Sequence, residues 1–241
     1  PQQFLNFFPL PQMQGSFLFT FIIITYLKFL KLKHGKIFII KFFMKPILII
    51  PCFNDNGYLK ELLNSETLKD SDFDILVLDD GSDDKVSKEK IGMDFNLIRN
   101  RTNRGKGYSI KKGFKYALDR DYTHAVTLDA DLQHDPKYIN DLIKIDDDVD
   151  IVIGARSFGG DMPFLRRFSN SVTSYIVSKL IGKPIHDSQS GYRRYKLSSS
   201  PFNQCLENGF QFESEILINT LRQKHSTLDH IAISTLYNDE K

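Results

Sequence analysis

The sequence predicts an α/β domain in which helices flank a mostly parallel sheet. From Met44 onward, short apolar runs rich in Ile, Val and Leu alternate with amphipathic stretches. This alternation is typical of right-handed βαβ units. The 241 residues, 41% of them hydrophobic, also provide enough apolar surface for a sizeable core. Parallel sheets of this kind bind ligands beyond the carboxyl ends of their strands, so the residues that follow each apolar run are the candidate site.

The predicted strands are brief apolar runs bounded by turn residues. They cover residues 47–53, 73–79, 95–98, 125–129 and 151–154. The predicted helices place their apolar residues on one face and cover residues 58–68, 106–119 and 136–145. The last of these opens on a proline, which is common in the first helical turn. A fourth helix, opened by Arg166 and Arg167, has an apolar face that begins at Phe168.

Residues 1–43 form a separate apolar and basic segment, while residues 44–241 are predicted to form the globular α/β domain. The apolar run 17–30 is interrupted by Lys28 and is shorter than the roughly 20 residues of a membrane-spanning helix. The basic cluster begins at Lys28, near the end of this run, whereas a secretory signal has its basic residues before the apolar run. Two interpretations stay open: a membrane-surface anchor, or translated AT-rich upstream sequence that is not native.

Charge and cysteine content exclude two classes of protein. The first 43 residues contain five lysines and no acidic residue, which leaves 27 basic against 30 acidic residues afterwards. A domain with this balance is not predicted to bind nucleic acid. Cys52 and Cys205 lie far apart without zinc-site spacing, so we expect two reduced thiols and no disulfide framework.

Polar residues follow the first two predicted strands. Pro51, Asn54 and Asp55 end the first strand and are explained equally well by a turn. Asp79 and Asp80 end the second strand within LVLDDGS. Adjacent like charges are costly unless something uses them. These carboxylates could accept hydrogen bonds from a base or ribose, or they could cap the next helix; both interpretations stay open.

Two further segments could bind a phosphate and a cation. Lys106 begins a helix within NRGKGYSIKKG, where free backbone N–H groups favour an anion. The segment TLDADLQHDP places Asp129, Asp131 and Gln133 just after an apolar strand. Two carboxylates and an amide oxygen are hard ligands suited to Mg²⁺ or Mn²⁺. A lone DxD is weak evidence for a metal site. Here the evidence is stronger, because the DxD follows a predicted strand and the same chain also carries LVLDDGS at the end of another strand.

Basic residues downstream could contact phosphate oxygens. Arg156 follows the last predicted strand, and Arg166 and Arg167 open the fourth helix. Arginine pairs with phosphate better than lysine does, although solvated surface residues are the plainer interpretation. Asp187 lies in a polar turn, DSQSGYR. Glu213 begins a later helix, where its charge would suit the helix dipole.

Taken in order, these motifs resemble glycosyltransferase family 2, and most closely its polyprenyl- and dolichyl-phosphate sugar synthases. The resemblance covers residues 46 to about 240 and rests on PCFNDN, LVLDDGS, NRGKGYSIKKG, TLDADLQHDP, IGAR, DSQSGYR and GFQFESEIL. It implies a GT-A fold, which is a Rossmann-like, mostly parallel sheet flanked by helices. It also implies inverting transfer of a hexosyl or N-acetylhexosaminyl group from a UDP- or GDP-sugar with a divalent cation.

The resemblance also implies roles for individual residues. Nucleotide contacts fall on Pro51, Asn54, Asp55 and Asp80, metal ligands on Asp129, Asp131 and Gln133, phosphate contacts on Arg156 and one of Arg166 or Arg167, and a position near the reacting centre on Asp187. Two departures are Asp55, where the family usually has glutamate, and Phe53, where it usually has tyrosine. Base preference therefore cannot be predicted. The chain also ends at Lys241 without the transmembrane helices of some relatives, which is compatible with a fragment.

The acceptor and the rival functions complete the prediction. The resemblance favours a lipid phosphate, which is ionised at neutral pH and needs little base help, at the cytoplasmic face of a membrane. A glycan hydroxyl would need a carboxylate such as Asp187, Glu213 or Glu215. A nucleotidyltransferase would show an early glycine- and arginine-rich loop, which PCFNDNGYL lacks. A phosphatase would carry DxD on its first strand, and the intact DxD argues against a silent nucleotide-binding module.

Overall fold

The computed structural model describes residues 32–33, 36–37, 44–69, 71–156 and 164–235, with the side chains of 32–33, 36–37 and 164–167 outside the description. The chain falls into two compact units, Pro1–Phe43 and Met44–Lys241. In the first unit, the described strands β1 (Leu32–Lys33) and β2 (Lys36–Ile37) form an antiparallel pair. The remainder of this unit lies outside the described residues.

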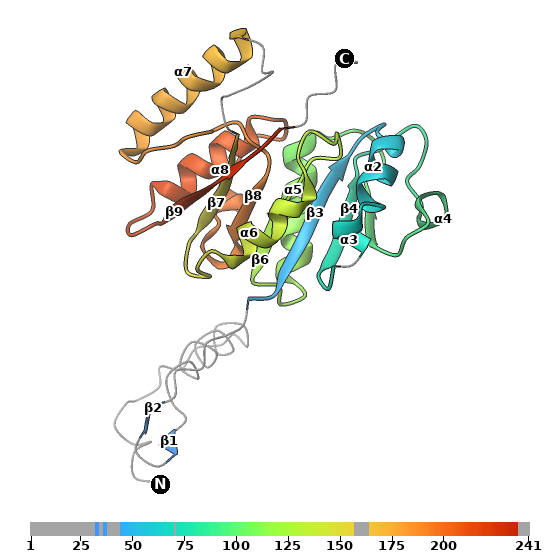
Figure 1. Cartoon of the computed structure of the whole chain (residues 1–241), viewed down its shortest axis with the longest axis horizontal. Coiled ribbons are helices and arrows are strands. Elements are labelled where there is room, and N and C mark those ends of the chain that lie inside the picture. The colour runs from blue at the N-terminus through green and yellow to red at the C-terminus, as the bar shows by residue number, and fades with distance from the viewer. Residues whose placement is uncertain (1–31, 34–35, 38–43, 70, 157–163, 236–241) are drawn as a thin grey trace. The chain divides into compact units, whose positions relative to one another are not determined.

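The second unit is built on a seven-stranded sheet with the order β5-β4-β3-β6-β8-β7-β9 (Figure 1). Its strands are β3 (Pro46–Cys52), β4 (Asp74–Asp79), β5 (Asn96–Arg99), β6 (His124–Thr127), β7 (Ile151–Arg156), β8 (Arg193–Lys196) and β9 (Leu228–Ile233). Neighbouring strands pair in parallel except at β8, which is antiparallel to both β6 and β7. The predicted mostly parallel α/β sheet is therefore confirmed.

Helices cover both faces of this sheet. They are α2 (Asn56–Leu63), α3 (Glu66–Lys69), α4 (Lys88–Ile91), α5 (Lys106–Leu118), α6 (Ile139–Lys144), α7 (Phe164–Ile181) and α8 (Phe212–Leu221), with short 3₁₀ turns at Pro136–Tyr138, Leu197–Ser199 and Phe202–Gln204. Side chains of β3 alternate between two cores, because successive residues of a strand point to opposite faces. Ile47 and Ile49 pack with α5 and α8, whereas Leu48 and Ile50 pack with α2, α3, α4 and α6.

The predicted elements agree with the structure except that two helices differ and three elements were not predicted. The predicted helix 58–68 is interrupted after α2, where the Asn64 side chain donates to Lys60 O (2.8 Å) and Ile91 O (3.1 Å) and so competes with helical hydrogen bonding. The predicted helix 136–145 begins as a 3₁₀ turn before α6. The short helix α4 and the strands β8 and β9 were not predicted.

Strand β8 escaped prediction because its residues, RRYK, do not form an apolar run. Arg193 and Arg194 are nevertheless fully buried. The Arg194 guanidinium donates to five backbone carbonyls of residues 142–149, including those of Leu142 (3.1 Å) and Ile145 (2.6 Å). Backbone oxygens therefore compensate a buried charge that a hydrophobicity pattern places on the surface.

Two smaller predictions concern cysteines and membrane spans. Cys52 and Cys205 are free, as predicted, and both are buried. Burial raises the pKa of the Cys52 thiol to about 11, so this thiol is protonated at neutral pH. Within the described part of the chain, every helix is too short or too polar to cross a bilayer.

Candidate active site

The predicted site residues gather at one edge of the sheet. Asp79 ends β4, Asp129 follows β6 by two residues, and Arg156 is the last residue of β7. These strands and β3 run in the same direction, so their carboxyl ends meet at one edge. Pro51 lies inside β3, opposite Leu78, rather than beyond the strand. The linear motifs are thus brought together by the parallel topology.

The turn after β3 is joined to the turn after β4. Asn54 adopts a positive φ of 57°, and its backbone N–H donates to Ser82 Oγ (2.9 Å). Its side-chain amide donates to Asp83 Oδ2 (3.1 Å), while Asp83 N–H donates to Asn54 Oδ1 (2.8 Å). Asp55 is the N-cap residue of α2, although its side chain forms no capping hydrogen bond. The two predicted nucleotide-contacting turns therefore form one polar surface.

The contacts of Asp79 hold the turn after β4 in place. Its side chain is fully buried, and it accepts hydrogen bonds from Ser82 N–H (2.9 Å) and Val86 N–H (3.3 Å). It also forms an ion pair with Arg99, whose other guanidinium nitrogen donates to Ser82 O (2.7 Å). These contacts favour a role in fixing the turn that carries Ser82, which in turn holds Asn54.

Asp80 anchors the entry to α5. Its carboxylate accepts hydrogen bonds from Arg104 N–H (3.0 Å), Gly105 N–H (2.7 Å) and Asn100 Nδ2 (2.7 Å). Gly105 has a φ of 96°, and a Cβ added there would lie 2.3 Å from Asn208 O. A glycine is required at this position for both reasons. Asp80 thereby fixes the loop that presents Lys106.

Lys106 joins three elements at the centre of the site. Its Nζ lies 2.6 Å from Asp129 Oδ1 and 2.8 Å from Glu213 Oε1, at the start of α8. Burial lowers the pKa of Lys106, but the two carboxylates outweigh it, and the net pKa lies above its ordinary value. Burial likewise opposes ionisation of Asp129, yet the nearby ammonium brings its pKa below the usual range. Lys106 is therefore charged and Asp129 ionised at neutral pH.

Arg156 and Asp187 form a second buried ion pair. The guanidinium donates in a two-pronged manner, from Nε to Oδ2 (2.6 Å) and from an Nη to Oδ1 (2.9 Å). Gln189 and Ser190 N–H groups also donate to Asp187 Oδ1, each at 3.1 Å. Burial raises the pKa of Asp187, but Arg156 more than compensates and the net pKa is lowered. A carboxylate so stabilised is a weak base, which favours a role in orienting Arg156.

The residues after Asp129 suit a divalent cation. Leu132 has a φ of 60°, and Gln133 N–H donates to Asp131 Oδ1 (3.1 Å). Burial lowers the pKa of His134 to about 4, so its imidazole is neutral and does not repel a cation at neutral pH. Its buried Nδ1 has no hydrogen-bond partner within the described residues. Hard oxygen donors beside a neutral imidazole fit Mg²⁺ or Mn²⁺.

Protein side chains alone would not complete such a site. Across the described ranges, no three His, Cys, Asp or Glu side chains are grouped closely enough to hold a metal ion. Two carboxylates and one amide would therefore leave positions for other oxygens, as expected where a cation also binds a substrate phosphate. Arg166 and Arg167 lie in the first turn of α7, and their side chains are outside the description.

Sequence reasoning missed the contacts of Arg99, Asn100 and Arg193. It considered Glu213 as a candidate base or as a complement to the helix dipole, but it did not predict the ion pair of Glu213 with Lys106, 107 positions away in the chain. Arg193 donates to Ser188 O, Ser190 O and Glu213 O, and so links the Asp187 turn to α8. The arginine pair that follows Tyr192 could have indicated these contacts, but adjacent charged residues are normally expected at the surface.

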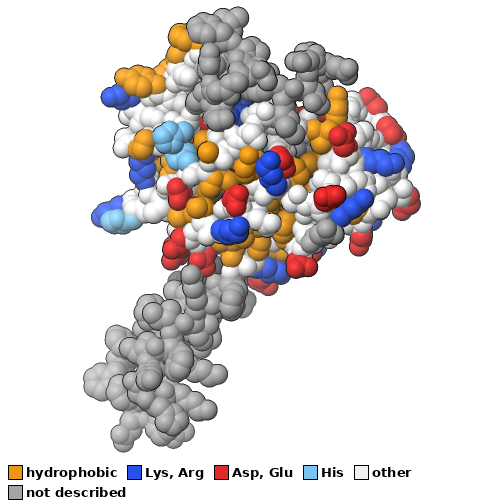
Figure 2. All heavy atoms as spheres, in the orientation of Figure 1, with side chains coloured by type: hydrophobic (Ala, Val, Ile, Leu, Met, Phe, Trp, Pro, Cys, Tyr) orange, Lys and Arg blue, Asp and Glu red, His pale blue; other side chains and the backbone are white. Residues whose placement is uncertain are grey.

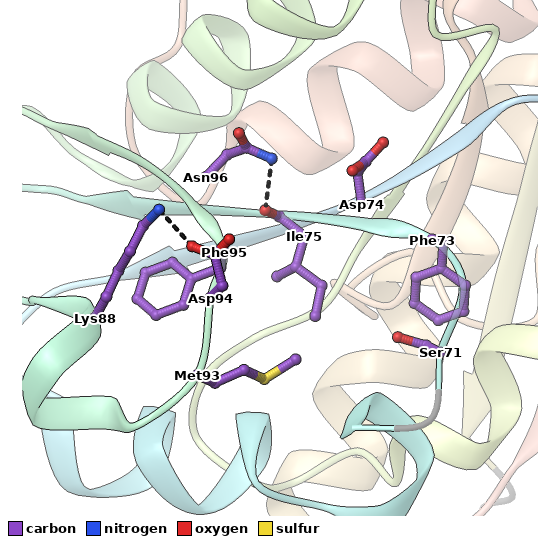
Figure 3. A pocket seen from close by; sticks show the side chains of 9 residues that line it. All are labelled: Ser71, Phe73, Asp74, Ile75, Lys88, Met93, Asp94, Phe95 and Asn96. Atoms are coloured by element: carbon purple, nitrogen blue, oxygen red, sulfur yellow. Dashed lines mark hydrogen bonds and ion pairs between the residues drawn. The ribbon is translucent and has the colours of Figure 1, made fainter.

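A pocket of about 290 Å³ lies elsewhere in the molecule (Figure 3). It is lined by residues at the amino ends of β4 and β5, among them Asp74, Phe95 and Asn96. Figure 3 shows the Lys88–Asp94 ion pair at its rim and the Asn96 amide on Ile75 O. Since the charged cluster of Lys106 and Asp129 lies at the carboxyl ends, this pocket is not part of the candidate site.

Known proteins resemble this chain in sequence and in fold. A UDP-N-acetylglucosamine–dolichyl-phosphate N-acetylglucosaminyltransferase of Methanococcus voltae is 29% identical over 218 residues, covering 80% of this chain and 86% of that protein. A polyprenol monophosphomannose synthase of Mycolicibacterium smegmatis is 31% identical over 200 residues, covering 77% and 75%. The predicted resemblance to polyprenyl- and dolichyl-phosphate sugar synthases is confirmed.

Among solved structures, glucosyl-3-phosphoglycerate synthase of Mycobacterium tuberculosis with Mn²⁺, UDP and glucosyl-3-phosphoglycerate superposes with a TM-score of 0.63 at 15% identity. The match covers 82% of this chain and 73% of that one, and it confirms the predicted GT-A fold. The sequence model of glycosyl transferase family 2 matches residues 47–208, which include strands β4 to β8, nearly all of β3, the DxD segment and the Asp187 turn. The chain therefore belongs to glycosyl transferase family 2.

Proposed function

We propose that this glycosyltransferase moves a sugar, with inversion, from a UDP- or GDP-sugar to a polyprenyl or dolichyl phosphate. The observation that carries the proposal is the charged edge of the sheet. There the ionised Asp129 contacts Lys106 and precedes the turn of Asp131, and Arg156 ends β7, which is separated from β6 by β8. Carboxylates that hold a cation beside fixed cationic side chains are suited to a sugar diphosphate. The relatives' names supply the substrate classes.

Asp129, Asp131 and Gln133 would hold Mg²⁺ or Mn²⁺ in this proposal. The cation would neutralise negative charge that builds on the leaving diphosphate. Pro51, Asn54, Asp55 and Asp80 border the nucleotide, and Asp79 acts through the turn that it holds. The support for these roles is the shared carboxyl edge and the hydrogen bonds between the turns after β3 and β4.

The acceptor would attack the anomeric carbon from the face opposite the diphosphate. Arg156, oriented by Asp187, and one of Arg166 or Arg167 would bind phosphate oxygens. A lipid phosphate is already ionised and needs no general base. This agrees with the lowered pKa of Asp187, which makes that carboxylate a poor proton acceptor. The lowered pKa of Asp187 therefore supports a lipid phosphate over a glycan hydroxyl that would depend on Asp187 as its base.

Helix α7 supports a lipid acceptor and contact with a membrane, whose cytoplasmic face is the one that the family resemblance implies. One face of α7 packs on the Asp187 turn, where Ser174 Oγ accepts a hydrogen bond from Ser188 N–H (2.9 Å). Its other face exposes a row of apolar side chains: Phe168, Val172, Tyr175, Ile176 and Leu180. Figure 2 shows hydrophobic side chains at the surface in the region of α7. An apolar helix face of this kind can lie in the boundary of a bilayer.

The donor site is tested by calorimetric titration of the full chain with UDP, GDP and CMP, each with and without Mn²⁺. We expect one uridine or guanosine nucleotide to bind at least about tenfold more tightly with Mn²⁺, because the cation joins the diphosphate to Asp129 and Asp131. CMP serves as the control. Failure of all three nucleotides to bind folded protein would refute the donor site, and binding without transfer to polyprenyl phosphate would indicate a silent module.

Membrane contact through α7 is tested by vesicle flotation. Replacing both Phe168 and Ile176 with serine is expected to reduce the vesicle-bound fraction at least about fivefold, because two large apolar side chains leave the interface. Leu206→Ser is the matched control, since this leucine is 85% exposed but lies outside α7. Equal binding by the double variant and wild type would contradict the assignment and indicate another attachment, such as residues 1–43.

A further inference from the structure

The pair of carboxylates around Lys106 has a consequence for cation binding. Lys106 Nζ contacts Asp129 Oδ1 (2.6 Å) and Glu213 Oε1 (2.8 Å) at the same time, and its side chain is 11% exposed. Asp129 is also a predicted ligand of the divalent cation. An ammonium and a divalent cation at one carboxylate repel each other strongly where water is largely excluded. The two cations therefore compete for Asp129.

Close packing confines the lysine to these two partners. A Cβ added to Gly191 would lie 2.7 Å from Asp129 Oδ2, 2.8 Å from Glu213 Oε1 and 2.9 Å from Lys106 Nζ. Gly191 thus forms a wall against all three charged groups. Glu213 is only 6% exposed, so its charge is also poorly solvated and retains a need for a counterion. If the ammonium leaves Asp129, Glu213 is the partner that can keep it.

We propose that Lys106 is a built-in counterion of the cation site, which neutralises Asp129 in the free protein and is held by Glu213 when a divalent cation binds Asp129. This inference rests on the proposed function, because it takes Asp129 as a cation ligand. Lys106 is then a positioning residue that weakens cation binding until a nucleotide diphosphate adds its own negative charge. Cation and nucleotide would bind together more tightly than either alone.

The competition is tested by electron paramagnetic resonance, which measures free Mn²⁺ directly, on the full chain without nucleotide. Lys106→Met is expected to bind Mn²⁺ about tenfold more tightly than wild type, because the competing ammonium is gone. Glu213→Gln is expected to bind Mn²⁺ about threefold or more weakly, because Lys106 is left with Asp129 as its partner. Melting curves establish that each variant is folded.

The double variant separates this proposal from simple electrostatics. If Glu213 acts through Lys106, Glu213→Gln changes Mn²⁺ affinity by less than about twofold when Lys106 is already methionine. Additive effects would show that Glu213 acts on the cation directly and would overturn its role as the second partner. Unchanged or weaker Mn²⁺ binding by Lys106→Met, including no binding by either protein, would overturn the competition itself.

If Lys106→Met does not fold, Glu213→Gln carries the test, and unchanged or tighter Mn²⁺ binding by that variant overturns the inference.

Two outcomes keep this inference distinct from the proposed function. If the Mn²⁺ affinities behave as expected but no nucleotide binds, the donor assignment fails while the counterion role stands. If nucleotides bind with Mn²⁺ but both variants bind it like wild type, the counterion role fails alone.

Discussion

Asp131→Ala is expected to reduce sugar transfer about a thousandfold or more while leaving the protein folded, since several kcal/mol of transition-state stabilisation depends on the cation. Asp131 lies in the turn after β6, partly exposed, and it accepts a hydrogen bond from Gln133 N–H (3.1 Å). Substitution of a partly exposed polar residue generally changes unfolding free energy by about 0.5 kcal/mol or less. Catalysis and folding should therefore separate at this position.

The measurement is initial-rate transfer to polyprenyl phosphate from the donor identified by titration, together with thermal unfolding. Asp94→Ala is the matched control, because Asp94 is an exposed carboxylate in an ion pair with Lys88 at the opposite edge of the sheet. We expect it to retain transfer. Global unfolding of Asp131→Ala would refute the site assignment, and so would retention of wild-type transfer.

Arg193→Met is expected to destabilise the protein by about 3 kcal/mol or more, because charge-assisted hydrogen bonds contribute about 1.5–3 kcal/mol each. The fully buried guanidinium donates to Ser190 O (2.6 Å), Glu213 O (2.6 Å) and Ser188 O (2.8 Å). Methionine occupies a similar volume but cannot donate a hydrogen bond to any of these three carbonyls. For a domain of this size, the loss corresponds to a melting temperature lower by about 6–12 °C.

Calorimetric melting checks this expectation, with Arg222→Met as control because that arginine is exposed at the end of α8. Arg193→Lys should have an intermediate melting temperature, since one ammonium cannot serve three carbonyls in the same geometry. Folded Arg193→Met protein should also show weakened transfer, because the turn of Asp187 loses its tie to α8. A melting temperature equal to wild type would show that the carbonyls find other donors.

The adjacent carboxylates Asp79 and Asp80 show how neighbouring residues acquire different tasks. Asp79 faces Arg99 and the backbone of its own turn, whereas Asp80 faces the loop before α5. Each charge is compensated by a separate set of donors, which removes the cost of placing two carboxylates side by side. Both carboxylates therefore support the site chiefly by holding loops in place.

The sequence by itself determined the α/β class and five of the seven sheet strands, and it predicted the carboxyl edge as the place of the candidate site. These features depend on local periodicity and on the order of motifs, both of which are properties of neighbouring residues. The same reasoning identified the polar segments after β3, β4, β6 and β7. Family membership followed from seven motifs in one order, which is far more specific than the DxD segment alone.

Only the tertiary structure decided which charges meet. β8 is antiparallel and polar in sequence, and its arginines become acceptable in the interior because backbone carbonyls of distant loops surround them. Lys106 and Glu213 belong to different helices, and their contact requires α5 and α8 to pack on the same face of the sheet. Such pairings depend on long-range packing, which leaves no periodic signal in the chain.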